Sequence, residues 1–286
     1  MNKEKRILLL MFFGVLIIAW AGIFVRLATT PPFITAFYRM FFSIIFLIPV
    51  FVYKYRDRLD YFWDYRPVIV GFFLAVHFLL WISAFEYTNI GNAVIFIAIQ
   101  PLFTIILEYF FAREDLREGV IIGILLALLG SIIISVGELN ILFERFWGNL
   151  LALLAAFFAA CYLFSGRSLR KEIEYLPYIS LVYTYATVFL GIFIIINNIP
   201  FTGYSGQNYL YLLGLAVGPT LIGHSIFNYS VRFIPATMVS LAIIGEPILT
   251  TILGWLLLGE TITLPTFIGG ILILIGIYQA IRISSP

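Results

Sequence analysis

The chain has 286 residues, of which 62% are hydrophobic and 11% are charged, and its formal net charge is +2. About a quarter of the residues in a soluble domain are charged, so this composition excludes a soluble protein and indicates a chain embedded in a bilayer. Continuous apolar runs without period-two alternation exclude an outer-membrane barrel and predict an all-α polytopic membrane protein. In chain order, ten transmembrane helices are predicted, over Ile7–Val25, Ile34–Tyr53, Val68–Phe85, Gly91–Phe111, Gly119–Val136, Trp147–Phe164, Tyr178–Ile196, Tyr209–Val231, Ala236–Leu258 and Leu264–Ile281.

The basic residues predict the orientation, because Lys and Arg near helix ends are retained on the cytoplasmic side. With the amino terminus inside, cytoplasmic segments hold fourteen of the 17 basic residues. External segments hold only Arg26 and Arg145, and Arg39 lies inside the second helix. We therefore expect a multi-pass protein of the cell membrane with both termini cytoplasmic. The net charge then reflects topology, and no nucleic-acid partner is expected.

The first span also has features of a signal peptide, because Lys3–Arg6 precede an apolar run that contains Ala19-Trp20-Ala21. We reject cleavage, since the run continues through Val25 and its loss would leave nine helices. Cys161 is the only cysteine, so neither an intramolecular disulfide nor a cysteine metal cluster is expected.

The two halves of the chain repeat each other at a shift of 146 residues. Five helices in each half is an odd number, so the second half enters the membrane inverted relative to the first. We expect one five-helix repeat over residues 1–140 and a second over 141–286, with a substrate site between them. The matching pairs are Pro101 with Pro247, Thr104 with Thr250, Glu114 with Glu260, Gly123 with Gly269 and Gly130 with Gly276.

Both repeats carry a polar residue before a proline, Gln100-Pro101 and Glu246-Pro247. Proline lacks an amide donor and frees a carbonyl one turn earlier, which predicts a kink in each helix. The freed carbonyl then faces either a neighbouring helix or a water-filled cavity. The glycines of the next helix in each repeat allow close backbone contact, either in packing within the chain or in a homodimer.

His77 and His224, the only histidines, match at a shift of 147 residues and lie well inside apolar spans. Ionisable groups are costly there and are functional candidates, so both either line one cavity or donate to neighbouring helices as neutral groups. Amphipathic groups around them extend the candidate cavity lining to Trp20, Trp81, Tyr162 and Asn228.

Arg39 and Glu86 are both predicted toward the external side. They either pair with each other or bind opposite ends of a zwitterionic solute, since a guanidinium grips carboxylates in a fork.

Several stretches together resemble the EamA branch of the drug/metabolite transporter superfamily. These are Trp20-Ala21-Gly22, Arg39, Ala84–Asn89, Gln100–Phe103, and Asn228–Glu260 followed by Gly269-Gly270. The resemblance covers nearly the whole chain and is weakest around the sixth and seventh helices. It implies ten helices in an inverted five-plus-five repeat and export or exchange of small metabolites, amino acids among them. It also implies a central cavity lined by the third, fourth, eighth and ninth helices, which includes His77, Gln100, His224 and Glu246.

The sequence therefore predicts a secondary transporter that works by alternating access, with a small-molecule substrate and no cofactor. No glycine-rich phosphate loop or metal-binding motif indicates an enzyme. Glu246 is the one midplane candidate that is normally a carboxylate, so it either carries a coupled proton or stays protonated and structural. The alternative from another class is a membrane redox protein that binds haem through His77 and His224.

Overall fold

A computed structural model of the chain describes residues 3–56, 64–112, 118–139, 143–230 and 245–284, and the regular structure within these ranges is helical. Seven helical segments are long and apolar enough to cross a membrane. Three shorter apolar helices occupy the fifth, ninth and tenth predicted spans. The all-α, ten-span fold is thereby confirmed, and the beginning of the ninth predicted span, up to residue 244, lies outside the described residues.

The helices in chain order are α1 (Lys3–Ile18), α2 (Trp20–Leu27), α3 (Pro32–Tyr55), α4 (Arg66–Tyr87), α5 (Ile90–Ile97), α6 (Gln100–Leu107), α7 (Glu118–Leu139), α8 (Phe143–Glu172), α9 (Tyr175–Ile196), α10 (Gly206–Leu215), α11 (His224–Ser230), α13 (Gly245–Leu258) and α14 (Leu264–Ser284). Two π-helical segments, η2 (Glu108–Ala112) and η3 (Ala216–Gly223), continue α6 and join α10 to α11. Three predicted spans, the first, fourth and eighth, are thus divided into successive segments. The sixth is longer than predicted, because α8 continues through a polar end that the apolar run did not include.

The predicted kink at Pro101 is a break between α5 and α6. Ala98 and Ile99 separate the two helices, and Pro101 lies in the first turn of α6, where its missing amide is tolerated. Pro247 likewise lies near the beginning of α13. The carbonyl one turn before Pro247, which that proline is predicted to free, belongs to Ile243 and lies outside the described residues.

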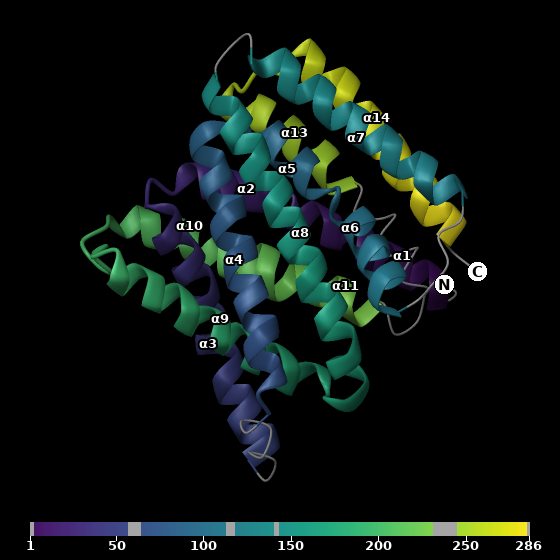
Figure 1. Ribbon diagram of the computed structural model, residues 1–286. Helices are drawn as coiled ribbons and strands as arrows, with labels where there is room; N and C mark the ends of the chain where they lie inside the picture. The colour runs from purple at the N-terminus through teal and green to yellow at the C-terminus, as the bar shows by residue number, and fades with distance from the viewer. Residues whose placement is uncertain (1–2, 57–63, 113–117, 140–142, 231–244, 285–286) are drawn as a thin grey trace.

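The glycine faces of the two repeats pack against each other inside the chain. Helices α7 and α14 lie side by side along the upper right of Figure 1. A Cβ added at Gly123 would lie 2.5 Å from the Gly276 carbonyl oxygen, and one at Gly269 would lie 2.5 Å from that of Gly130. The order of these contacts makes the helices antiparallel, as inverted repeats require. A homodimer would therefore have to form through residues other than these glycines.

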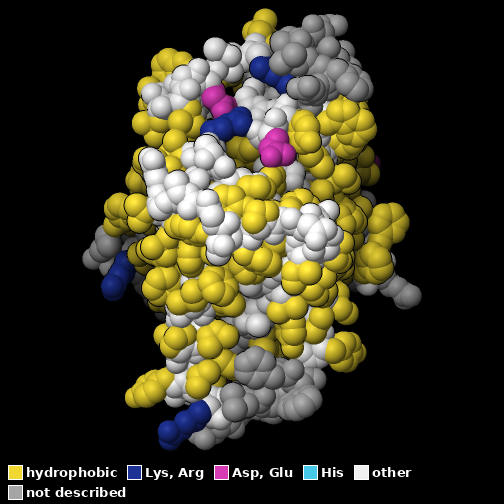
Figure 2. Space-filling view, turned by 90° about the vertical axis from the view of Figure 1, so that its left-hand side faces the viewer, with side chains coloured by type: hydrophobic (Ala, Val, Ile, Leu, Met, Phe, Trp, Pro, Cys, Tyr) yellow, Lys and Arg dark blue, Asp and Glu magenta, His cyan; other side chains and the backbone are white. Residues whose placement is uncertain are grey.

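The two halves of the chain interdigitate elsewhere as well. Helix α4 packs on α8 and α9, α3 packs on α9, and α1 packs on η3 and α11. Large hydrophobic side chains are exposed on the outer faces, among them Phe12, Ile132 and Leu256. Figure 2 shows such side chains over much of one face, with a small group of charged side chains near its top. This distribution suits contact with lipid, and the chain is a multi-pass integral membrane protein.

Candidate functional site

Among the residues that the structure describes, the most deeply buried charged group is Arg39 in α3, with only 2% of its surface exposed. Its Nε donates to the hydroxyl of Thr220 in η3 at 2.8 Å. Pro219 lies inside η3, and the next residue, Thr220, donates its hydroxyl to the Leu215 carbonyl at 3.0 Å. This hydrogen bond orients the Thr220 hydroxyl as the acceptor for Arg39.

The guanidinium of Arg39 lies over aromatic side chains of α4. Its Cζ is 4.0 Å from the centre of the Phe78 ring and 5.6 Å from that of Trp81. These cation–π contacts hold the charge away from water. Within the described part of the chain, Arg39 Nη1 and Trp81 Nε1 are both buried and have no hydrogen-bond partner.

The two histidines lie near this guanidinium and near each other. The Nδ1 atom of His77 in α4 is 3.0 Å from the Ala155 carbonyl oxygen of α8. His77 and His224 both lie within electrostatic reach of Arg39, and His224 lies within reach of His77. The positions that match in the two repeats therefore come together at the interface between the halves.

Glu246 of α13 and Tyr183 of α9 complete the group around Arg39, both within its electrostatic reach. Tyr183 is buried, whereas Glu246 is partly exposed. We call the six residues that surround or hold this guanidinium the central polar cluster: His77, Trp81, Tyr183, Thr220, His224 and Glu246. Its members come from α4, α9, η3, α11 and α13, so both halves of the chain contribute.

Three predicted site residues are not found in the central polar cluster. Two have no described contact with Arg39, and the side chain of the third is not described. Trp20 is 41% exposed and its ring contacts Phe24. Gln100 begins α6, where its carbonyl accepts from the Thr104 hydroxyl, and no described contact joins it to Arg39. The side chain of Asn228 lies outside the described part of the structure.

Tyr162 is partly exposed on α8 and interacts with Tyr178 and Tyr183 rather than with Arg39. It therefore borders the central polar cluster through Tyr183. The predicted pairing of Arg39 with Glu86 is wrong for the described structure. Glu86 is exposed at the end of α4, while Arg39 is buried and bonds to Thr220.

A second charged network joins the halves at the predicted external side. Arg26 of α2 pairs with Glu260, which follows α13, at 2.9 Å. The same guanidinium donates to the carbonyls of Phe85 and, at 2.9 Å, Thr88. Glu260 also accepts the backbone N–H of Ile90 at 2.7 Å, at the amino terminus of α5, where a negative charge is favourable. We call this network the external clamp.

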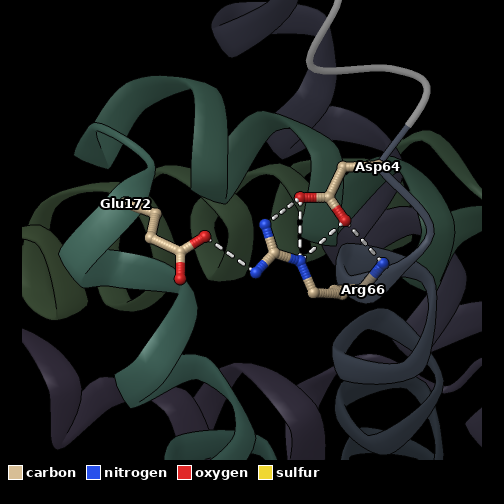
Figure 3. A network of polar contacts seen from close by, with 3 residues as sticks. All are labelled: Asp64, Arg66 and Glu172. Carbon is tan, nitrogen blue, oxygen red and sulfur yellow. Dashed lines mark hydrogen bonds and ion pairs between the residues drawn. The ribbon is translucent and has the colours of Figure 1, made fainter.

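A third network lies at the predicted cytoplasmic side (Figure 3). Arg66, the first residue of α4, pairs with Glu172 at the end of α8 at 2.8 Å and with Asp64 at 2.8 Å. Hydrogen bonds from Arg66 hold the pKa of Asp64 below its usual value. Nearby, the Tyr55 hydroxyl donates to Glu174. Because α4 and α8 belong to different halves, the network of Arg66 with Asp64 and Glu172 forms a cytoplasmic clamp.

A helical membrane protein whose two inverted halves enclose a buried polar cluster has the architecture of a membrane transporter. The EamA-like transporter family model matches the chain twice, over residues 5–136 and 146–282. The chain therefore belongs to the EamA-like transporter family, in the drug/metabolite transporter superfamily.

Its relatives are described as uncharacterized transporters. One from Archaeoglobus fulgidus is 28% identical, over 68% of this chain and 69% of the relative. YdfC of Bacillus subtilis is 26% identical, over 73% of this chain and 68% of YdfC. YxxF of the same species is 24% identical, over 96% of this chain and 89% of YxxF. A crystal structure with 17% identity superposes with a TM-score of 0.67, covers 98% of this chain and 99% of its own, and shows the same fold.

Proposed function

We propose that the protein is a secondary transporter that exports or exchanges small metabolites, amino acids among them, across the cell membrane by alternating access. It acts as a carrier rather than an enzyme. The observation that carries this proposal is the central polar cluster, because Arg39 and His77 of one half meet Thr220 and His224 of the other deep inside apolar helices. Polar groups buried in a membrane protein mark a substrate path.

The two clamps support alternation between an outward-open and an inward-open state. Each joins the first half to the second, one at each end of the molecule. Opening one end requires the clamp there to separate, while the other can remain closed. The intact contacts at both ends and the burial of Arg39 and Trp81 fit a state closed over the cluster.

The proposal includes the expected topology. Both termini are cytoplasmic, the repeats span residues 1–140 and 141–286, and the clamps then face opposite compartments. The excess of Lys and Arg in alternate connections supports this orientation.

Glu246 is proposed to carry a coupled proton, because it is the carboxylate of the cluster and lies within electrostatic reach of Arg39. Replacing Glu246 with Gln keeps the size and a hydrogen-bond donor but removes the titratable group. If coupling operates through Glu246, the variant still exchanges substrate across a proteoliposome membrane but is no longer accelerated by a pH gradient. Normal gradient-driven transport in the variant would show that Glu246 is structural.

Haem binding through His77 and His224 receives no support from the relatives, which are described as transporters. An absorption spectrum of the protein purified from haem-supplemented cells tests this alternative, and we expect no Soret band.

The experiment that tests the proposed function begins with a thermal-shift screen of the purified full-length chain against a metabolite library. A ligand that binds the folded state raises the melting temperature by mass action. Hits are then loaded into proteoliposomes to measure efflux and exchange. Saturable transport of at least one hit is the expected result, and no transport of any hit would overturn the proposal.

A further inference from the structure

We propose that the solute carried by this protein bears a single carboxylate, which binds between Arg39 Nη1 and Trp81 Nε1. This inference rests on the proposed transport function and names the substrate class of the same site. The observation behind it is a pair of buried donors, from α3 and α4, that no described group of the protein satisfies.

Two unsatisfied donors at one place are unusual in a folded protein. More than nine in ten buried polar groups have a partner, and a buried donor that lacks one destabilises the fold. Arg39 and Trp81 are 2% and 4% exposed, so bulk water does not satisfy them in this state. A bound ligand that accepts two hydrogen bonds would satisfy both at once.

The orientation of the guanidinium is fixed before any ligand binds. Nε is committed to Thr220, and Cζ lies 4.0 Å from the centre of the Phe78 ring. The Trp81 ring also lies within cation–π distance of Arg39, so its indole belongs to the same small region. A preorganised pair of donors binds an acceptor at a lower entropic cost than flexible side chains do.

The charges around Arg39 and Trp81 determine which kind of hydrogen-bond acceptor a bound ligand can offer them. Both free groups are donors, which favours a ligand that only accepts, and a guanidinium matches the two oxygens of a carboxylate. Arg39 is the one permanent cation that the described central polar cluster surrounds, and Glu246 lies within its electrostatic reach. When Glu246 carries its proton, a single carboxylate balances the Arg39 charge, whereas a dianion such as a phosphate monoester would leave one negative charge unbalanced. A monocarboxylate group is therefore the better match.

The test uses acids paired with their own amides, because the pair differs at the proposed contact and little elsewhere. The probes are acetate and acetamide, lactate and lactamide, L-leucine and L-leucinamide, and L-phenylalanine and L-phenylalaninamide. Affinities come from thermal-shift titrations of the full-length protein in detergent, and transport of the same probes is measured in proteoliposomes. We expect at least one acid to bind and to be transported in preference to its amide.

Trp81→Phe is the decisive variant, because it removes the indole N–H and keeps an aromatic ring beside Arg39. Loss of a hydrogen bond to a charged group should weaken binding of the preferred acid about tenfold or more and leave its amide unchanged. Trp255→Phe is the matched control, since Trp255 is 57% exposed on α13, and it should bind as the unaltered protein does. Arg39→Lys, which keeps the charge but not the fork, should weaken the acid further.

Equal binding of acids and amides, or an unchanged acid affinity in Trp81→Phe, would overturn the carboxylate site. If the amides or other hits from the metabolite library are still transported, the transport function stands and only the substrate class is wrong. If no solute of any kind is transported, the proposed function itself fails, and the carboxylate site with it.

Discussion

Replacing Gly123 or its repeat mate Gly269 with alanine tests the close packing of α7 on α14. The new Cβ would lie 2.5 Å from a backbone carbonyl oxygen, that of Gly276 or Gly130 respectively. A backbone atom cannot rotate away as a side chain can, so the two helices must separate locally. Overpacking of this kind costs about 1–3 kcal/mol. At about 2–4 °C per kcal/mol, each variant should melt several degrees lower.

The assay is thermal unfolding of the purified variants in one detergent, and Gly191→Ala on α9 is the matched control. A Cβ at Gly191 would lie 3.5 Å from the Phe37 ring, an ordinary contact, so this variant should melt at the same temperature or slightly higher. The Gly123→Ala and Gly269→Ala double variant should lose less than the sum, because both changes separate the same two helices. Melting temperatures equal to that of Gly191→Ala would refute the reasoning.

Three further predictions concern topology, the histidines and the cytoplasmic clamp. Cysteine labelling in intact cells should place Asn140 and Gln207 outside the cell, and Arg58 and Arg170 inside it. One position on the wrong side would contradict the ten-span topology. His77→Ala and His224→Ala should each lower transport about tenfold, the equivalent of one hydrogen bond, while the protein remains folded by size-exclusion chromatography. Unimpaired transport in both would remove the histidines from the site. At neutral pH, Asp64→Asn should lower the free energy of unfolding by at most about 1 kcal/mol, measured by the stability of the variant against the unaltered protein. Because Arg66 lowers the folded-state pKa of Asp64, this difference should begin to shrink as the pH falls below about 4, the value in the unfolded chain, and should disappear once the pH is below the lowered folded-state pKa. A difference that stays constant throughout this acid range would refute the ion pair.

The helical fold was largely predictable, because hydropathy and the positions of Lys and Arg depend on the bilayer rather than on tertiary contacts. The ends of α3, α4 and α9 lie within a few residues of the prediction. The polar end of α8 was missed because it extends beyond the apolar run, where contacts such as that of Arg66 with Glu172 stabilise it. Apart from the one at Pro101, breaks inside a span were not predicted, because they depend on which side chains from other helices bond the backbone carbonyls. At the break between α1 and α2, for example, the Ala19 carbonyl accepts from the Thr250 hydroxyl.

The candidate site was only partly predictable, because a helix position along the chain does not determine which face meets which neighbour. The repeat indicated that His77 and His224 come together, since symmetry relates them directly. Arg39 has no matching residue in the second repeat. The sequence offered Glu86 as a pairing partner on the same side of the membrane, and that pairing is wrong. The available signal was Pro219-Thr220, a helix-breaking proline followed by a hydroxyl inside an apolar span, and Thr220 is the residue that Arg39 bonds.

Substrate exchange in proteoliposomes tests the central claim of alternating access most directly. Labelled solute identified by the thermal-shift screen is supplied outside vesicles that contain either buffer or the same unlabelled solute. A carrier whose central polar cluster faces one side at a time must turn back to the outside after it releases solute inside, and it does so faster with solute bound. Internal solute should therefore accelerate uptake, and the rate of uptake should saturate with external concentration. Uptake that does not saturate and is indifferent to internal solute would indicate a channel and contradict this account.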